Sequence, residues 1–175
     1  KNIMVYVETA EGNPVKVGLE MLSPAKKLAD KVTAVVIGGG VADAAKEVAK
    51  AGADQVICVD SEDYKEFNLD AYAQVLVELV KEENPEAVFV GGTQDGKDIA
   101  PIVAAKCNTG CASDVLDIKA EDGEVIYTCP LYGGTVLEDV KIKTTPQVAT
   151  LRSGAFQKVE EPTEGEVVAK EVKVA

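Results

Sequence analysis

The sequence contains no histidine among its 175 residues, and its only arginine is Arg152. Histidine is the side chain best suited to proton transfer near neutral pH, so its absence excludes catalytic triads and other histidine-based acid–base schemes. Hydrolytic chemistry is therefore disfavoured. Because all other positive charge is lysine, Arg152 is the one planar, forked cation, suited to a carboxylate, a phosphate, an aromatic ring or a surface ion pair.

Cysteine is also scarce, with four residues and no CxxC spacing. Four are too few for a disulfide scaffold in a chain of this length, so we expect free thiols. Cys107 and Cys111 are spaced to meet on one helical turn. Zinc would nevertheless need two further ligands in a chain without histidine, and no metal site is predicted.

Long apolar runs are absent, and the opening residues KNIMVYVETAEG lack the basic start and apolar stretch of a signal peptide. The net charge of −12 repels phosphate backbones and anionic lipid. We therefore expect a soluble cytoplasmic protein (in the mitochondrial matrix if the source is eukaryotic), with no nucleic-acid partner and no membrane insertion. Its 46% hydrophobic content is enough for one compact domain over residues 1–175.

What the first two thirds of the sequence do contain is an alternation of apolar, β-branched runs with helical periodicity. Strands are predicted at 3–8, 32–39, 55–60 and 87–92, and helices at 15–30, 41–52, 70–81 and 99–106. Strands that are apolar throughout are typical of a parallel sheet covered on both faces. The predicted fold is a three-layer α/β/α sandwich, Rossmann-like and similar to the adenine-nucleotide hydrolases.

After Cys111 the sequence pattern changes to short β-prone runs separated by DG, GG and TTP turn signals. We expect a β-rich carboxyl-terminal part made of antiparallel or edge strands. The last residues, 157–175, begin polar and then alternate valine with lysine or glutamate, which fits either an edge strand or the start of a linker.

Ligands of open parallel sheets bind beyond the carboxyl ends of the strands, which makes the loops at 8–14, 38–40, 60–64 and 91–98 the expected functional edge. The last of these, GGTQDGKD, nearly matches a phosphate-binding loop. The position that needs a serine or threonine for magnesium is Asp98, however. We expect a helix start with Asp95 or Asp98 near the cap, and nucleotide binding through Lys97 is disfavoured.

Gly38 and Gly40 resemble the start of a dinucleotide fingerprint, but Asp43 occupies the third glycine position. An acidic group there disfavours a pyrophosphate. A tight turn is the better interpretation.

Three longer segments resemble the amino-terminal domain of the electron-transfer flavoprotein alpha subunit: GKDIAPIVAAKCNTGCASDVLDI, PLYGGT and PQVATLRSGAF. The opening IMVYVETAEG, the run VTAVVIGG and the run GADQVICVD fit the same pattern, so the likeness covers the whole chain.

The resemblance implies a docking and structural domain that supports flavin-to-flavin electron transfer without catalysing bond chemistry. In that family the subunit's own FAD belongs to a second, carboxyl-terminal domain, which this chain lacks, so no cofactor is expected on this chain alone. The implied partner is the beta subunit, in a heterodimer, which binds AMP or a second flavin; acyl-CoA-type or other dehydrogenases supply the electrons.

By the same resemblance, the residues expected nearest the partner's flavin or nucleotide are Cys129, Tyr132, Gly133, Gly134 and Arg152. Those expected at the partner interface are Lys97, Asp98 and Thr135. This sequence departs from the family at two of these positions: Cys129 replaces an arginine and Thr135 replaces an asparagine. A thiol supplies no cation there. The rival hypothesis is a free-standing adenine-nucleotide-binding sensor or enzyme that uses the loops at 38–40 and 91–98.

Overall fold

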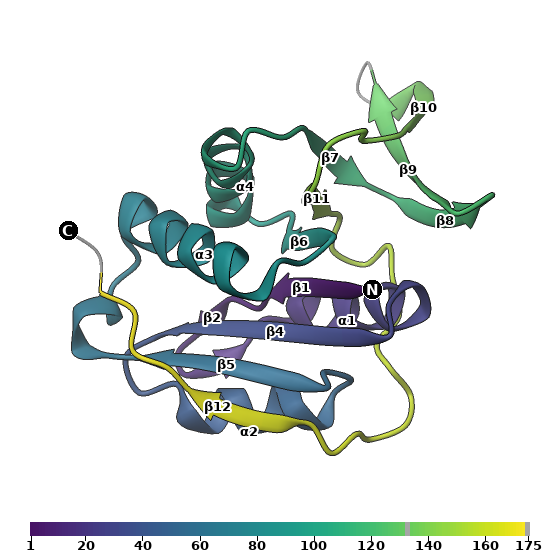
Figure 1. Cartoon of the computed structure of the whole chain (residues 1–175). Helices are drawn as coiled ribbons and strands as arrows, with labels where there is room; N and C mark the ends of the chain where they lie inside the picture. Colours follow the sequence, from purple (N-terminus) through teal and green to yellow (C-terminus); the bar gives the residue numbers. More distant parts are fainter. Residues whose placement is uncertain (132–133, 174–175) are drawn as a thin grey trace.

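The computed structural model describes residues 1–131 and 134–173, and at its centre is a seven-stranded sheet in which every pairing is parallel (Figure 1). The strand order is β12-β5-β4-β1-β6-β11-β7. The strands are β1 (Asn2–Tyr6), β4 (Lys31–Gly38), β5 (Gln55–Asp60), β6 (Ala87–Gly91), β7 (Cys111–Val115), β11 (Gln147–Leu151) and β12 (Glu166–Ala169).

Helices cover both faces of this sheet: α1 (Lys16–Leu28) and α2 (Ala42–Lys50) lie on one, and α3 (Leu69–Glu83) and α4 (Gln94–Lys106) on the other. Successive strand side chains point to opposite faces. In β1, Ile3 and Val5 accordingly pack into the cluster of α1 and α2, whereas Met4 and Tyr6 pack into that of α3 and α4. The predicted three-layer sandwich is confirmed.

The chain reverses direction across the sheet at β1. It runs outward from β1 through β4 to β5 and then returns to place β6 on the other side of β1. The loops at the carboxyl ends of the parallel strands, here termed the strand-end edge, hold the short ladder β2 (Thr9–Ala10) with β3 (Asn13–Pro14) and the 3₁₀ turn η1 (Glu62–Tyr64). Ligands of such sheets bind at this reversal.

An antiparallel sheet of β8 (Asp117–Glu121), β9 (Glu124–Leu131) and β10 (Val136–Val140), here termed the arm, projects from the rest of the molecule, the body (Figure 1). It is anchored at its root, where the Leu116 N–H donates to the Thr128 carbonyl at 2.8 Å. The predicted β-rich carboxyl-terminal part is thus present, with antiparallel pairing.

After the arm, the chain adds two more strands to the seven-stranded sheet, β11 and β12. The tail does form an edge strand, because β12 pairs in parallel with β5 at one margin of the sheet. The expectation of only antiparallel or edge strands after Cys111 is wrong for β11, which is an interior parallel strand between β6 and β7. Its residues from Val148 to Leu151 are all buried, which requires cover on both sides.

The helices follow the predicted ranges closely except for α4, which begins at Gln94 and so takes in part of the expected loop. None of the helices in the described part of the chain is long and apolar enough to cross a membrane.

Candidate functional site

The stretch that resembles a phosphate loop forms the start of α4. Thr93 is the N-cap: its hydroxyl accepts a hydrogen bond from the Gly96 N–H at 3.0 Å and donates one to the Glu8 carboxylate. The expected helix start is confirmed, with Asp95 in the first turn near the cap, but the capping side chain itself is Thr93. Both aspartates already lie inside the helix, whereas the threonine hydroxyl stands where it can reach the free amide of the third helical residue.

Glu8 fills the place that a phosphate would take at this helix start. A helix N-terminus attracts negative charge, and here the chain supplies its own carboxylate from the end of β1. Burial raises the pKa of Glu8; the Thr93 hydrogen bond opposes that rise and the charge of Asp95 adds to it. A Cβ on Gly96 would lie 1.8 Å from the Gly91 carbonyl oxygen, so only glycine fits at this close approach.

The glycines after β4 serve the loop itself. Gly40 adopts a left-handed φ of 71°. A Cβ on Gly38 would lie 2.7 Å from Val41, and one on Gly39 would lie 3.0 Å from Lys65. Helix α2 then starts without a side-chain cap. The predicted tight turn is confirmed, and neither this loop nor the start of α4 offers a free cradle for a pyrophosphate.

The arm carries most of the predicted contact residues. Along the face of β9 that turns toward the body, Tyr127 is 0% exposed, Cys129 6% and Leu131 37%. Val136, which pairs with Leu131 across the ladder, is 47% exposed. The inner face of the arm therefore runs past the body and ends in Leu131 and Val136, whereas Leu137, which pairs with Pro130, points from the opposite face. These three residues at the end of the arm are termed here the apolar overhang.

Cys129 is buried between the arm and β7. Burial raises the pKa of its thiol, a backbone hydrogen bond with Ser113 opposes this, and the charges of Glu138, Asp114 and Asp139 raise it further. Cys129 thus packs into the apolar core, and three nearby carboxylates further disfavour its thiolate.

Arg152 is held at the end of β11 by one of these carboxylates. Its Nε donates to Asp114 Oδ1 at 2.9 Å and its Nη2 donates to Asp114 Oδ2, which makes a two-pronged pair on the surface. Asp114 has a left-handed φ of 59°, and its N–H donates to the Thr150 hydroxyl at 2.8 Å. Asp114 therefore connects Arg152 with the surroundings of Cys129, and the surface-pair interpretation of Arg152 is confirmed.

At the arm's tip, Gly134 and Thr135 are exposed, and Gly134 has a left-handed φ of 94°. Tyr132 and Gly133 lie outside the described residues.

Lys97 and Asp98 are exposed on α4. The loop before α4 is tied to the end of β11, because the Gly92 N–H donates to the Leu151 carbonyl at 2.8 Å. The start of α4 and the residue before Arg152 are thus neighbours.

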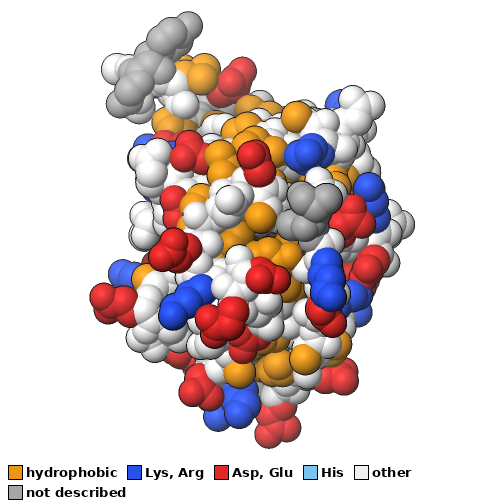
Figure 2. Space-filling view, turned by 90° about the vertical axis from the view of Figure 1, so that its left-hand side faces the viewer, with side chains coloured by type: hydrophobic (Ala, Val, Ile, Leu, Met, Phe, Trp, Pro, Cys, Tyr) orange, Lys and Arg blue, Asp and Glu red, His pale blue; other side chains and the backbone are white. Residues whose placement is uncertain are grey.

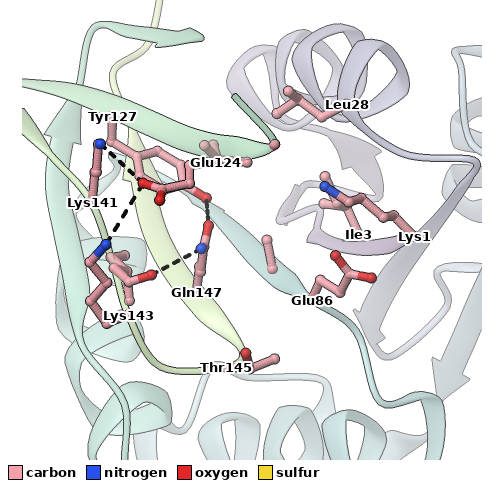
Figure 3. A pocket seen from close by; sticks show the side chains of 14 residues that line it. Lys1, Ile3, Leu28, Glu86, Glu124, Tyr127, Lys141, Lys143, Thr145 and Gln147 are labelled. Carbon is pink, nitrogen blue, oxygen red and sulfur yellow. Dashed lines mark hydrogen bonds and ion pairs between the residues drawn. The ribbon is translucent and has the colours of Figure 1, made fainter. Parts of the chain in front are cut away.

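At the opposite, amino-terminal ends of the strands, a hollow of about 310 Å³ lies under the arm's root (Figure 3). The Tyr127 hydroxyl donates to Gln147 Oε1 at 2.8 Å, and Gln147 Nε2 donates to the Ile142 carbonyl at 3.0 Å. Lys141 pairs with Glu124 at 3.0 Å. Because these groups satisfy one another, the hollow serves to anchor the arm.

The electron transfer flavoprotein domain model matches residues 3–175. The chain belongs to the electron transfer flavoprotein family. It is 36% identical over 166 residues to the electron transfer flavoprotein subunit alpha of Clostridium acetobutylicum, covering 91% of this chain and 49% of that protein. It is 34% identical over 166 residues to the Bacillus subtilis subunit alpha, covering 93% and 51%.

A third relative is the lactate dehydrogenase (NAD(+),ferredoxin) subunit LctC of Acetobacterium woodii, 32% identical over 172 residues, covering 93% of this chain and 41% of that protein. The resemblance to the alpha subunit drawn from the sequence is confirmed. This electron transfer flavoprotein chain spans about half the length of the relatives it matches.

Sequence reasoning missed Glu8, Thr93 and Asp114. Glu8 and Thr93 are 85 residues apart, and Arg152 and Asp114 are 38 apart, so neither contact leaves a local pattern. A signal was present for Thr93, because threonine before a helical run is a preferred N-cap.

Proposed function

We propose that this chain is the first domain of an electron transfer flavoprotein alpha subunit and acts as a docking domain. It packs against the beta subunit in a heterodimer and supports electron transfer between flavins without catalysing bond chemistry. Acyl-CoA-type or other dehydrogenases deliver the electrons. FAD is held outside this chain, in a further domain of the alpha subunit and in bifurcating complexes also in the beta subunit.

The observation that carries this proposal is the apolar overhang. Leu131, Val136 and Leu137 are 37%, 47% and 59% exposed at the end of the arm, the first two on its inner face and Leu137 on the opposite face. β10 is also an edge of its sheet. Exposed apolar side chains grouped on a strand edge are typical of a protein–protein contact.

Two loops of this chain do not fit a pyrophosphate, which supports the proposal that FAD is held elsewhere. Glu8 occupies the anion position at the start of α4, and the loop of Gly38 and Gly39 is packed against its own chain. Neither accommodates the pyrophosphate of FAD or of an adenine nucleotide, which disfavours the rival nucleotide-binding function. At the end of β11, Arg152 is the group suited to approach a partner's cofactor, with Gly134 and Thr135 at the arm's tip and Lys97 and Asp98 on the neighbouring helix. The resemblance adds Tyr132 and Gly133, which lie outside the described residues.

The test is binding of the cognate beta subunit by isothermal titration calorimetry. Replacing Leu137, the most exposed apolar residue of the overhang, with serine should weaken binding by about tenfold or more, because a buried leucine at an interface contributes about 1.5 kcal/mol or more. Val167→Ser is the matched control, since Val167 is 39% exposed on β12 at the other margin of the sheet.

Equal loss of affinity in the two variants would show that the arm is not the docking surface. Flavin absorbance in the purified chain would contradict the placement of the cofactor elsewhere.

A further inference from the structure

A hollow of about 300 Å³ opens at the strand-end edge, between the loops that follow β1 and β4 and the start of α3. Figure 2 shows this edge of the molecule, on which apolar side chains form an interrupted band with both acidic and basic side chains on either side. The side chains that matter for the argument are Tyr6, Glu8, Lys65, Phe67, Tyr72 and Asp95, all of which line the hollow.

Tyr6 reaches the hollow from below with an unsatisfied hydroxyl. Its side chain is 2% exposed, and within residues 1–131 and 134–173 the hydroxyl has no hydrogen-bond partner. Burial raises the pKa of Tyr6, followed by the effects of Glu8, Tyr72 and Asp95, which all line the same hollow. Because this hydroxyl opens onto the hollow and makes no hydrogen bond within the described residues, it is available to a polar group supplied from outside.

Three carboxylates line this hollow: Glu8 and Asp95 are half-buried and Glu11 is exposed. Asp95 is half-buried and makes no hydrogen bond or ion pair with any other described residue. Glu8 accepts from Thr93 but has no positively charged partner among them either. Lys65 is the one basic residue in the lining, and it is exposed and pairs with neither carboxylate. The hollow therefore carries uncompensated negative charge, which repels phosphate and attracts cations.

An aromatic pair forms one wall. The rings of Phe67 and Tyr72 meet edge to face at 4.9 Å between centroids, and Phe67 is 38% exposed, so part of its ring is accessible. Aromatic faces attract ammonium and guanidinium groups, and they do so most strongly where nearby carboxylates add to the attraction.

We propose that this hollow binds the ammonium or guanidinium group of an organic cation, with Asp95 and Glu8 as counter-charges, the Tyr6 hydroxyl as a hydrogen-bond partner and Phe67 as the aromatic wall. Open parallel sheets often bind anionic nucleotides at this position. In this chain the hollow would instead prefer a cation. The proposal is independent of docking through the arm.

The test is an NMR titration of the purified chain with agmatine, which carries an ammonium and a guanidinium group, with AMP as the anionic comparison. Agmatine should shift the backbone amide signals of Gly12, Gly38 and Gly39, whose residues line the hollow, and AMP should not. Asp95→Asn should weaken agmatine binding by about tenfold and the isosteric Tyr6→Phe by about threefold, because each removes one partner of the cation.

Asp122→Asn is the matched control for Asp95→Asn. It makes the same chemical change on an exposed turn of the arm, outside the hollow. If Asp122→Asn weakens binding as much as Asp95→Asn, the attraction comes from the chain's net charge and the proposal fails. It also fails if AMP binds and agmatine does not, or if agmatine at about 10 mM, a concentration that detects even weak sites, shifts none of these amides.

Two further probes identify the source of the cation. If the natural guest is an arginine side chain of a protein, N-acetyl-arginine amide, which lacks an ammonium group, should bind about as well as agmatine. If it is a free diamine, putrescine should bind and N-acetyl-arginine amide should bind less tightly. Both outcomes support the hollow as a cation site.

Discussion

The body and the arm differ in how much of their surface is packed against the same chain. In the body, loops close upon their own chain: Glu8 occupies the start of α4, and Gly96 leaves no space between α4 and the Gly91 carbonyl. In the arm, the row Tyr127, Cys129, Leu131 passes from buried to exposed. Outside the hollow lined by Tyr6 and Asp95, the body is therefore closed on itself, whereas the arm ends in apolar side chains that another surface can cover.

The sharpest way to test this contrast is to add one methyl group to each region. Gly96→Ala should lower the free energy of unfolding by about 3 kcal/mol or more, because its Cβ would lie 1.8 Å from a backbone oxygen that cannot move aside without breaking the turn before α4. Urea denaturation measures this loss.

Gly123→Ala is the control in the arm. Its φ is 78° and no atom lies within 4 Å of the added Cβ, so only backbone strain remains, which costs about 1 kcal/mol. If the two variants lose equal stability, the tight closure of the body is not what distinguishes it.

The anchor of the arm gives a smaller expected effect. Tyr127→Phe should cost about 1–2 kcal/mol of unfolding free energy, because it leaves Gln147 Oε1 without the hydroxyl that lies 2.8 Å away at a side chain that is 0% exposed. Limited proteolysis should then cut the arm before the body. Unchanged stability together with an unchanged cleavage pattern would show that the arm is held by apolar packing alone.

The sequence predicted the body better than the arm because the two carry different local information. A strand such as β6 is buried on both faces and apolar throughout, and it can be recognised by itself. β11 is nearly as buried, but it includes Gln147 and Thr150 and pairs with strands far away in the sequence. Its parallel pairing is a property of the whole sheet and leaves no mark on five residues.

The candidate site was predicted in part for the same reason. Turn glycines and the single arginine are visible in the sequence, but their partners are not. Asp114 reaches Arg152 only because a register shift between β7 and β11 lets it adopt a left-handed backbone. The pKa of the Cys129 thiol likewise depends on carboxylates of the arm and of β7 that lie far away in the sequence.

The buried Glu8 at the strand-end edge also predicts that the free energy of unfolding depends on pH. The pKa of Glu8 is raised in the folded chain, chiefly by burial, so the folded state holds the proton more firmly than the unfolded state. The stability that this provides is present below the unfolded pKa of about 4.3 and is lost as the pH rises through the folded value. Glu8→Gln should therefore gain stability relative to the natural chain as the pH increases from about 4 to about 7.

Urea unfolding at both pH values measures this difference. Glu47→Gln, on the exposed side of α2, makes the same chemical change away from the strand-end edge and is the control. A difference that shrinks with rising pH would mean that the Thr93 hydrogen bond and the helix start favour the ionised carboxylate more than burial disfavours it.

The smallest expected effect concerns the arm's contact with a partner's flavin, on the proposed docking arrangement. Cys129→Arg restores the family's cation, and a positive charge beside a flavin raises its midpoint potential by stabilising the anionic reduced form. Here the new guanidinium would stand opposite Glu138 and close to Asp114, so most of its charge would be balanced within the arm. We expect a rise on the order of 10 mV in a potentiometric titration of the reconstituted heterodimer.

Adding Glu138→Gln to the same chain should enlarge the rise, since it removes the cross-strand counter-charge. If the double variant and the single variant leave the potential where the natural chain has it, position 129 is too far from the flavin to act on it, and the thiol belongs to the packing between the arm and β7.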